Sequence, residues 1–145
     1  MSDSMYQRAI LELAEAGHGH GLLESADGKA LLDNPLCGDR VALNVRLAGD
    51  TLAALGHEVR GGLLCRAAAS LIGLKAPGRS TAELKAMPEA VAMMLSELAA
   101  PPAGWEALSA FEPVRAHRSR HGCVVLPFQA RAAALAGGRS APARG

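Results

Sequence analysis

Aromatic side chains and net charge are both scarce in this sequence. Two Phe, one Trp and one Tyr are the aromatic residues of a 145-residue chain whose formal net charge at pH 7 is +1. A chain so close to neutral has no overall field to attract nucleic acid or an anionic membrane. It also lacks the rows of aromatic rings on which RNA-binding modules stack bases. We therefore expect no nucleic acid and no membrane among its partners.

Long apolar runs are missing too, and cysteine is rare. No run approaches the roughly 20 apolar residues of a bilayer span. The N-terminal stretch MSDSMYQRAILELAEAG is acidic and amphipathic, unlike a secretory signal or a transit peptide. These features predict a cytoplasmic protein. Cysteine occurs at positions 37, 65 and 123 alone, so no disulfide framework is expected in that reducing compartment.

Apolar residues nevertheless make up 50% of the chain, enough for the core of one compact domain. Their spacing, with caps and turn signals, predicts helices at 3–16, 63–74, 88–99 and 123–135, a short helix from Ser80 or Thr81, and a helical turn at 105–111. We expect the domain to span residues 1–136. Residues 137–145, rich in Gly, Pro and Arg, are expected to be a flexible tail.

The strand signal lies in the middle of the chain. Residues 41–47 alternate in polarity, Gly49-Asp50 makes a turn, and 52–60 is the returning strand of a hairpin. Residues 22–32 are mixed and predict no clear element. The expected class is therefore α+β, a small antiparallel β-sheet built on a hairpin and covered by several α-helices.

Each cysteine lies where the chain changes direction. Cys37 is in a Pro/Gly-punctuated loop two residues before Asp39, Cys65 is in the first turn of the helix after the hairpin, and Cys123 opens the last helix. A helix N-terminus stabilises a thiolate, which is both the nucleophile and the metal ligand. Zinc or iron takes about four such ligands. Cys37, Asp39, Cys65 and Cys123 make four, with His121 as a reserve ligand or proton donor.

Plainer interpretations stay open for these residues. Each cysteine is also compatible with a buried core or loop residue, because free cysteine is often buried. His57 is expected on the exposed face of its strand. The basic run 115–121 is expected to be an exposed patch that meets an acidic partner. A Cys/His hydrolase using Cys123 with His117 or His121 has no third orienting residue in the sequence.

The motifs NPLCGDR at 34–40 and SRHGCVVLPFQA at 119–130 carry a family resemblance. Together with the hairpin and the Gly-rich helix start between them, they resemble the NifU/IscU-like scaffolds of iron–sulfur cluster assembly. The likeness covers Leu32 to Leu135 and is closest to the SufU-like branch.

That resemblance implies three cysteines and one aspartate around a metal. Cys37 matches the first family cysteine, Asp39 the aspartate and Cys123 the third cysteine. Scaffold members assemble a [2Fe–2S] cluster for acceptor apo-proteins. SufU-like members hold Zn2+ and accept persulfide sulfur from a cysteine desulfurase. The thiols of Cys37 and Cys123 are the expected reactive groups, in a scaffold protein or a sulfurtransferase-type sulfur acceptor.

The sequence departs from the family pattern at two positions. Gly122 stands where IscU-like members have a histidine, and the second family cysteine falls on Gly62. Cys65 is three residues further along, about 4.5 Å on a helix axis. Either Cys65 is the ligand on a displaced helix, or the family ligand is lost. The second case makes the chain a degenerate member with an incomplete metal site, acting as a binding or regulatory partner.

Overall fold

The structure is a computed structural model of the whole chain. It describes residues 2–36, 38–97 and 99–137, with side chains from Arg8 to Ala136 within those ranges. Cys37 and most of the expected tail therefore lie outside the described residues. The elements, in chain order, are α1 (Ser2–Ala16), β1 (Gly28–Asn34), β2 (Asp39–Ala48), β3 (Thr51–Arg60), α2 (Leu63–Lys75), α3 (Thr81–Glu97), the 3-10 helices η1 (Glu106–Ala116) and η2 (Arg118–Arg120), and α4 (His121–Gly137).

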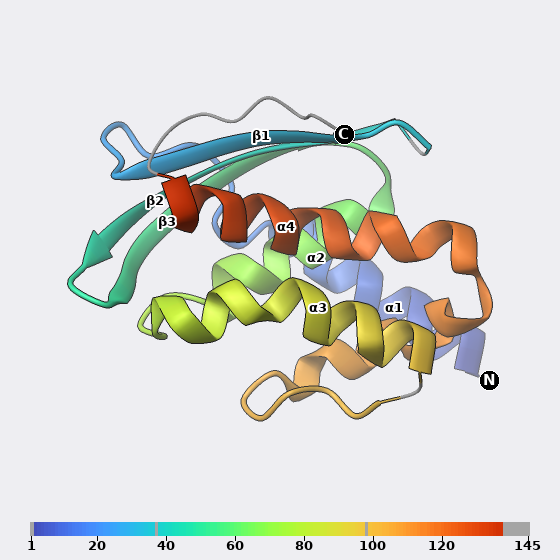
Figure 1. Cartoon of the computed structure of the whole chain (residues 1–145). Coiled ribbons are helices and arrows are strands. Elements are labelled where there is room, and N and C mark those ends of the chain that lie inside the picture. Colours follow the sequence, from blue (N-terminus) through green and yellow to red (C-terminus); the bar gives the residue numbers. More distant parts are fainter. Residues whose placement is uncertain (1, 37, 98, 138–145) are drawn as a thin grey trace.

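The strands form one antiparallel sheet in the order β1-β2-β3. Figure 1 shows the helices gathered below this sheet, with α4 running along its underside. α4 packs across β1 and β2, α2 lies against β3, and α3 and α1 pack on these two helices. The expected α+β class with an antiparallel sheet is confirmed.

Residues of alternating polarity explain why the sheet is covered on this face. In β2 the side chains of Val41, Leu43 and Val45 are buried, while Arg40 and Arg46 are exposed. Alternate residues of a strand point to opposite faces, so the three apolar residues meet the helices. The core of the molecule therefore lies between the sheet and α2 and α4.

The structure corrects the secondary structure at two places. Residues 28–34, of which 28–32 belong to the stretch expected to form no clear element, form β1 by pairing with β2. The two helices expected from Thr81 and at 88–99 are one helix, α3, with Pro88 inside it. Proline has no amide N–H for the carbonyl four residues earlier, which here is Leu84. The guanidinium of Arg131 donates to that carbonyl at 3.3 Å, so a side chain of α4 replaces the missing helical donor.

His57 is also placed differently from expectation, because it is buried rather than exposed. The Gly17–Gly21 loop returns over the edge of β3, where the amide of His57 donates to the carbonyl of Gly19 and its Nε2 lies 2.8 Å from the carbonyl oxygen of His18. A Cβ on Gly73 of α2 would collide with the backbone of His18. The loop is thus wedged between β3 and α2, and it covers His57.

In the described part of the chain, each helix is too short or too polar to cross a bilayer.

Candidate functional site

Three chain segments that carry the expected site residues meet at one end of the sheet. They are the β1–β2 turn, the β3–α2 connection and the start of α4, which share one end of the molecule in Figure 1. Asn34 pairs with Asp39 across the turn, and Arg40 pairs with Arg60. The side chain of Asn34 approaches Gly122 at the start of α4. Antiparallel register therefore brings positions 34–40, 60–62 and 122 together.

Asp39 occupies a seat made by two glycines. Its side chain is only 4% exposed, although it stands at the first position of β2, and its Oδ1 accepts a hydrogen bond of 3.0 Å from the amide of Gly62. A Cβ on Gly61 would lie 2.8 Å from Cγ of Asp39 and would also collide with Oδ1. Glycine at 61 is therefore required for the carboxylate to reach this position.

The two described cysteines each lie in the first turn of a helix. Cys65 of α2 is 0% exposed and Cys123 of α4 is 9% exposed. Within residues 2–36, 38–97 and 99–137, no three His, Cys, Asp or Glu side chains lie close enough to hold a metal ion. The structure therefore does not bring the three described candidates, Asp39, Cys65 and Cys123, together as a metal-binding group, and the fourth candidate, Cys37, lies outside the described residues.

His121 is held by η1 at one of its ring nitrogens. Its Nε2 lies 3.1 Å and 3.2 Å from the carbonyl oxygens of Val114 and Arg115, so a proton on Nε2 donates to them. That arrangement leaves Nδ1 as the nitrogen for a metal or a proton transfer. The reserve-ligand role expected for His121 thus has one nitrogen to use.

The basic run 115–121 divides into held and exposed residues. Arg115 donates to the carbonyl oxygens of Met94 and Ala99, at 3.0 Å and 2.9 Å, so it ties η1 to the end of α3. His117, Arg118 and Arg120 are exposed. The exposed cations of this run are therefore concentrated in η2, directly before the helix that carries Cys123.

A pocket of about 480 Å³ borders Asp39 on the outside of the molecule. Its lining includes Asn34, Asp39 and Arg60, together with Arg40, which is ion-paired to Asp33 at 2.7 Å. Leu36, in the same turn, is 90% exposed. An open, partly cationic surface therefore adjoins the buried carboxylate.

Comparison with known proteins identifies the family. The model of the NifU-like N-terminal domain matches residues 5–113, more than half of the chain. The chain belongs to the NifU-like family. This is a family of iron–sulfur cluster assembly scaffolds, and the family resemblance seen in the sequence is confirmed. No curated protein sequence matches the chain.

Solved structures agree with the NifU-like assignment. The crystal structure of a nitrogen-fixing NifU-like protein (N-terminal) from Brucella abortus is 30% identical, with a TM-score of 0.85 over 92% of this chain and 93% of that one. A putative iron–sulfur cluster assembly scaffold protein for the SUF system from Fervidobacterium islandicum is 22% identical, with a TM-score of 0.83 over 93% and 99%. At that identity the second likeness shows the fold alone.

The position at which the sequence resemblance expects the second cysteine of the NifU-like family is exposed. Gly62, where the second family cysteine is expected, has an extended backbone with φ −79° and ψ −176°. No described atom lies within 4 Å of a Cβ built there. A cysteine at this position would therefore fit without a clash in the described structure. The remaining donors, thiols and a carboxylate, suit zinc or iron in their chemistry.

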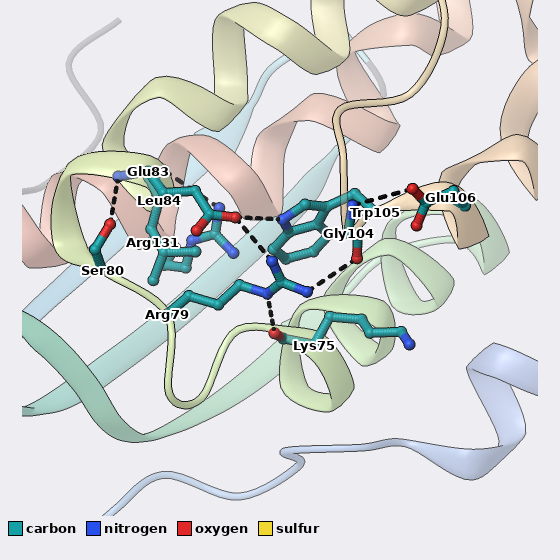
Figure 2. A network of polar contacts seen from close by, with 9 residues as sticks. All are labelled: Lys75, Arg79, Ser80, Glu83, Leu84, Gly104, Trp105, Glu106 and Arg131. Carbon is teal, nitrogen blue, oxygen red and sulfur yellow. Dashed lines mark hydrogen bonds and ion pairs between the residues drawn. The ribbon is translucent and has the colours of Figure 1, made fainter.

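The structure also contains a polar cluster that the sequence did not predict (Figure 2). Trp105 donates its indole N–H to Glu83, which also pairs with Arg79 at 2.9 Å. The guanidinium groups of Arg79 and Arg131 lie 5.1 Å and 5.3 Å from the Trp105 ring centre. Arg131 is fully buried, and burial lowers its pKa to about 9, so it stays charged at neutral pH. Pro88, which was expected to open a separate helix, instead lies inside α3, whose residue Leu84 accepts the hydrogen bond from Arg131.

Proposed function

We propose that this chain serves iron–sulfur cluster assembly as a scaffold or as a zinc-bound sulfur acceptor, with a cysteine desulfurase as sulfur donor and apo-proteins as acceptors. The observation that carries the proposal is the carboxylate of Asp39, seated by Gly61 and Gly62 at the end of the sheet where α4 begins. Cys37, Asp39, Cys65 and Cys123 are the proposed donors. Zinc or a nascent [2Fe–2S] cluster is the proposed cargo.

The chemistry of sulfur acceptance needs only a thiolate on this chain. The thiolate of Cys37 or Cys123 attacks the terminal sulfur of a persulfide on the donor enzyme. A new S–S bond forms, the donor's S–S bond breaks, and the donor cysteine leaves as a thiolate that takes up a proton. The N-terminal end of α4 favours the charged form of Cys123. Exposed His117, Arg118 and Arg120 are proposed to meet an acidic surface of the donor.

The test is metal content, followed by transfer. The wild-type chain, purified without oxygen, is expected to hold about one zinc ion per chain. Cys123→Ser and Asp39→Ala should each weaken zinc binding by more than about tenfold. Asp50→Ala, an exposed carboxylate in the β2–β3 turn, is the matched control and should bind like wild type. Unchanged metal content and cluster transfer in Asp39→Ala would refute the proposal.

Gly62 supports a second candidate, a degenerate family member that binds or regulates a partner. The exposed position 62 is a glycine and carries no thiol, although the resemblance expects a cysteine there. Zinc and iron near zero per chain, with all three cysteines titrating as thiols after unfolding, would favour this candidate over a scaffold.

A further inference from the structure

The turn between β1 and β2 is organised by the side chain and backbone of Asn34. Oδ1 of Asn34 accepts a hydrogen bond of 3.0 Å from the amide of Leu36, and its backbone carbonyl accepts one of 2.8 Å from Gly38. The first bond is an Asx turn, in which a side chain imitates a backbone turn. Position 37 lies between the two donors, so Asn34 fixes the chain on both sides of Cys37.

The other end of the same carboxamide meets α4. A Cβ built on Gly122 would lie 2.6 Å from Nδ2 of Asn34 and 3.7 Å from its Cγ. The carboxamide therefore fills the place that any side chain at 122 would take. Gly122 directly precedes Cys123, so the contact joins the Cys37 turn to the first turn of the Cys123 helix.

We propose that Asn34 is a positioning residue that clamps the turn carrying Cys37 against the helix start carrying Cys123, and that Gly122 is its receptor. The role rests on the proposed function, because it concerns how two donors are brought to one cargo. It also gives the departure at position 122 a physical reason. A histidine there would displace Asn34, so this chain has a clamp in place of a side-chain ligand.

A double-mutant cycle on positions 34 and 122 tests the clamp. Zinc affinity is measured by chelator competition for wild type, Gly122→Ala, Asn34→Ala and the double variant. Gly122→Ala should weaken zinc binding about tenfold in the wild-type background, because its Cβ expels the carboxamide. In the Asn34→Ala background the same change should cost less than about twofold, because nothing is left to expel.

Two further readouts separate positioning from general stability. Bound Co2+ reports its thiolate ligands through their charge-transfer absorption, which should fall in Gly122→Ala while the melting temperature of the metal-free chain changes little. Asn34→Asp, which keeps the shape and the acceptor for Leu36, should retain more affinity than Asn34→Leu, which keeps volume alone.

The outcomes are distinct. Additive losses in the cycle, or Asn34→Leu binding like wild type, overturn the clamp. So does unchanged zinc affinity in Asn34→Ala and Gly122→Ala when Cys123→Ser loses zinc, and the proposed function then survives. A wild-type chain that binds neither Zn2+ nor Co2+ overturns the proposed function and the clamp with it.

Discussion

Asp39 and Arg131 are two buried ionisable side chains, and their surroundings in the fold differ. Asp39 is held by a backbone amide at the end of the sheet, beside glycines and an open pocket. Arg131 of α4 stacks on the rings of Trp105 and Phe128 and donates one hydrogen bond to the carbonyl oxygen of Leu84 in α3. In the described part of the chain, its Nε and Nη1 have no hydrogen-bond partner.

The difference shows that burial alone does not mark a functional site. Asp39 lies against Gly61, accepts a hydrogen bond from Gly62 and borders an open pocket. The neighbours of Arg131 are large rings and a proline-broken helix turn, which together explain why a cation is there. The first arrangement belongs to the proposed binding site, whereas the second supplies a donor that the proline in α3 lacks.

The largest predicted effect is the loss of stability when Arg131 is removed. Arg131→Ala should lower the free energy of unfolding by about 2–4 kcal/mol, because it empties a fully buried volume and removes the donor to Leu84. Zinc binding per folded chain should not change. Chemical denaturation and chelator competition on the same samples measure both quantities.

Pro88 supplies the control for this interpretation. Arg131→Met keeps much of the volume but leaves the Leu84 carbonyl without its donor. Pro88→Ala restores an amide N–H at the position that pairs with Leu84 in a regular helix. Pro88→Ala should therefore recover part of the stability lost in Arg131→Met. Purely additive effects would show that Arg131 does not compensate for the proline.

The second predicted effect concerns the contact between Gly61 and Asp39. Substitution of Gly61 should affect zinc affinity more than it affects stability. Gly61→Ala places a Cβ against Asp39 and should cost about 1–3 kcal/mol of unfolding free energy, together with a loss of zinc affinity above tenfold. The neighbouring Gly62→Ala is a matched control, because a Cβ there meets open space. Gly62→Ala should leave the zinc affinity within about twofold of wild type and the unfolding free energy within about 0.5 kcal/mol.

An equal loss of zinc affinity in Gly61→Ala and Gly62→Ala would contradict the claim that Asp39 needs the space left by Gly61. Such a result would point to the flexibility of the Gly-Gly pair as the important property. Gly61→Ala with unchanged zinc affinity would instead show that Asp39 does not need this position.

Local pattern was enough to predict the hairpin, the main helices and the α+β class. It failed where long-range contacts decide the outcome. β1 exists because β2 offers it a pairing edge, and α3 continues through Pro88 because Arg131, 43 positions later in the numbering, reaches Leu84. Neither partner is visible in a local window of sequence.

The same reason limits what could be predicted of the site. The motif at 34–40 identified Asp39 but gave Asn34 no role, and the glycine pair at 61–62 was visible as a break after the hairpin. That Gly61 makes room for Asp39 follows only from the β2–β3 register, which sets Arg40 opposite Arg60. The contact of Asn34 with Gly122 depends on how α4 crosses the sheet, and no spacing in the sequence encodes it.

A third buried polar side chain, that of His57, gives the smallest predicted effect, which is on the pH dependence of stability. Burial lowers the pKa of His57, and its hydrogen bond to the carbonyl of His18 offsets this only in part. As the pH falls through about 6.5, the imidazole of His57 becomes protonated in the unfolded chain but stays neutral in the folded chain. Stability should be full above pH 6.5 and should fall as the pH drops from 6.5 through the lowered pKa. Like Arg131, His57 is a structural group, so zinc affinity at neutral pH should be unaffected.

Urea unfolding of wild type and His57→Gln between pH 7.5 and pH 5 measures this effect, with exposed His117→Gln as the control. The loss of stability on acidification should be smaller in His57→Gln than in wild type, and unchanged in His117→Gln. His20 and Arg66, which line the same hollow as His57, add positive charge near it, while Glu15 adds negative charge. His20→Gln should therefore reduce the acid sensitivity slightly, because it removes a like charge beside the ring. An identical pH profile in wild type and His57→Gln would mean that a group other than His57 governs the loss of stability in acid.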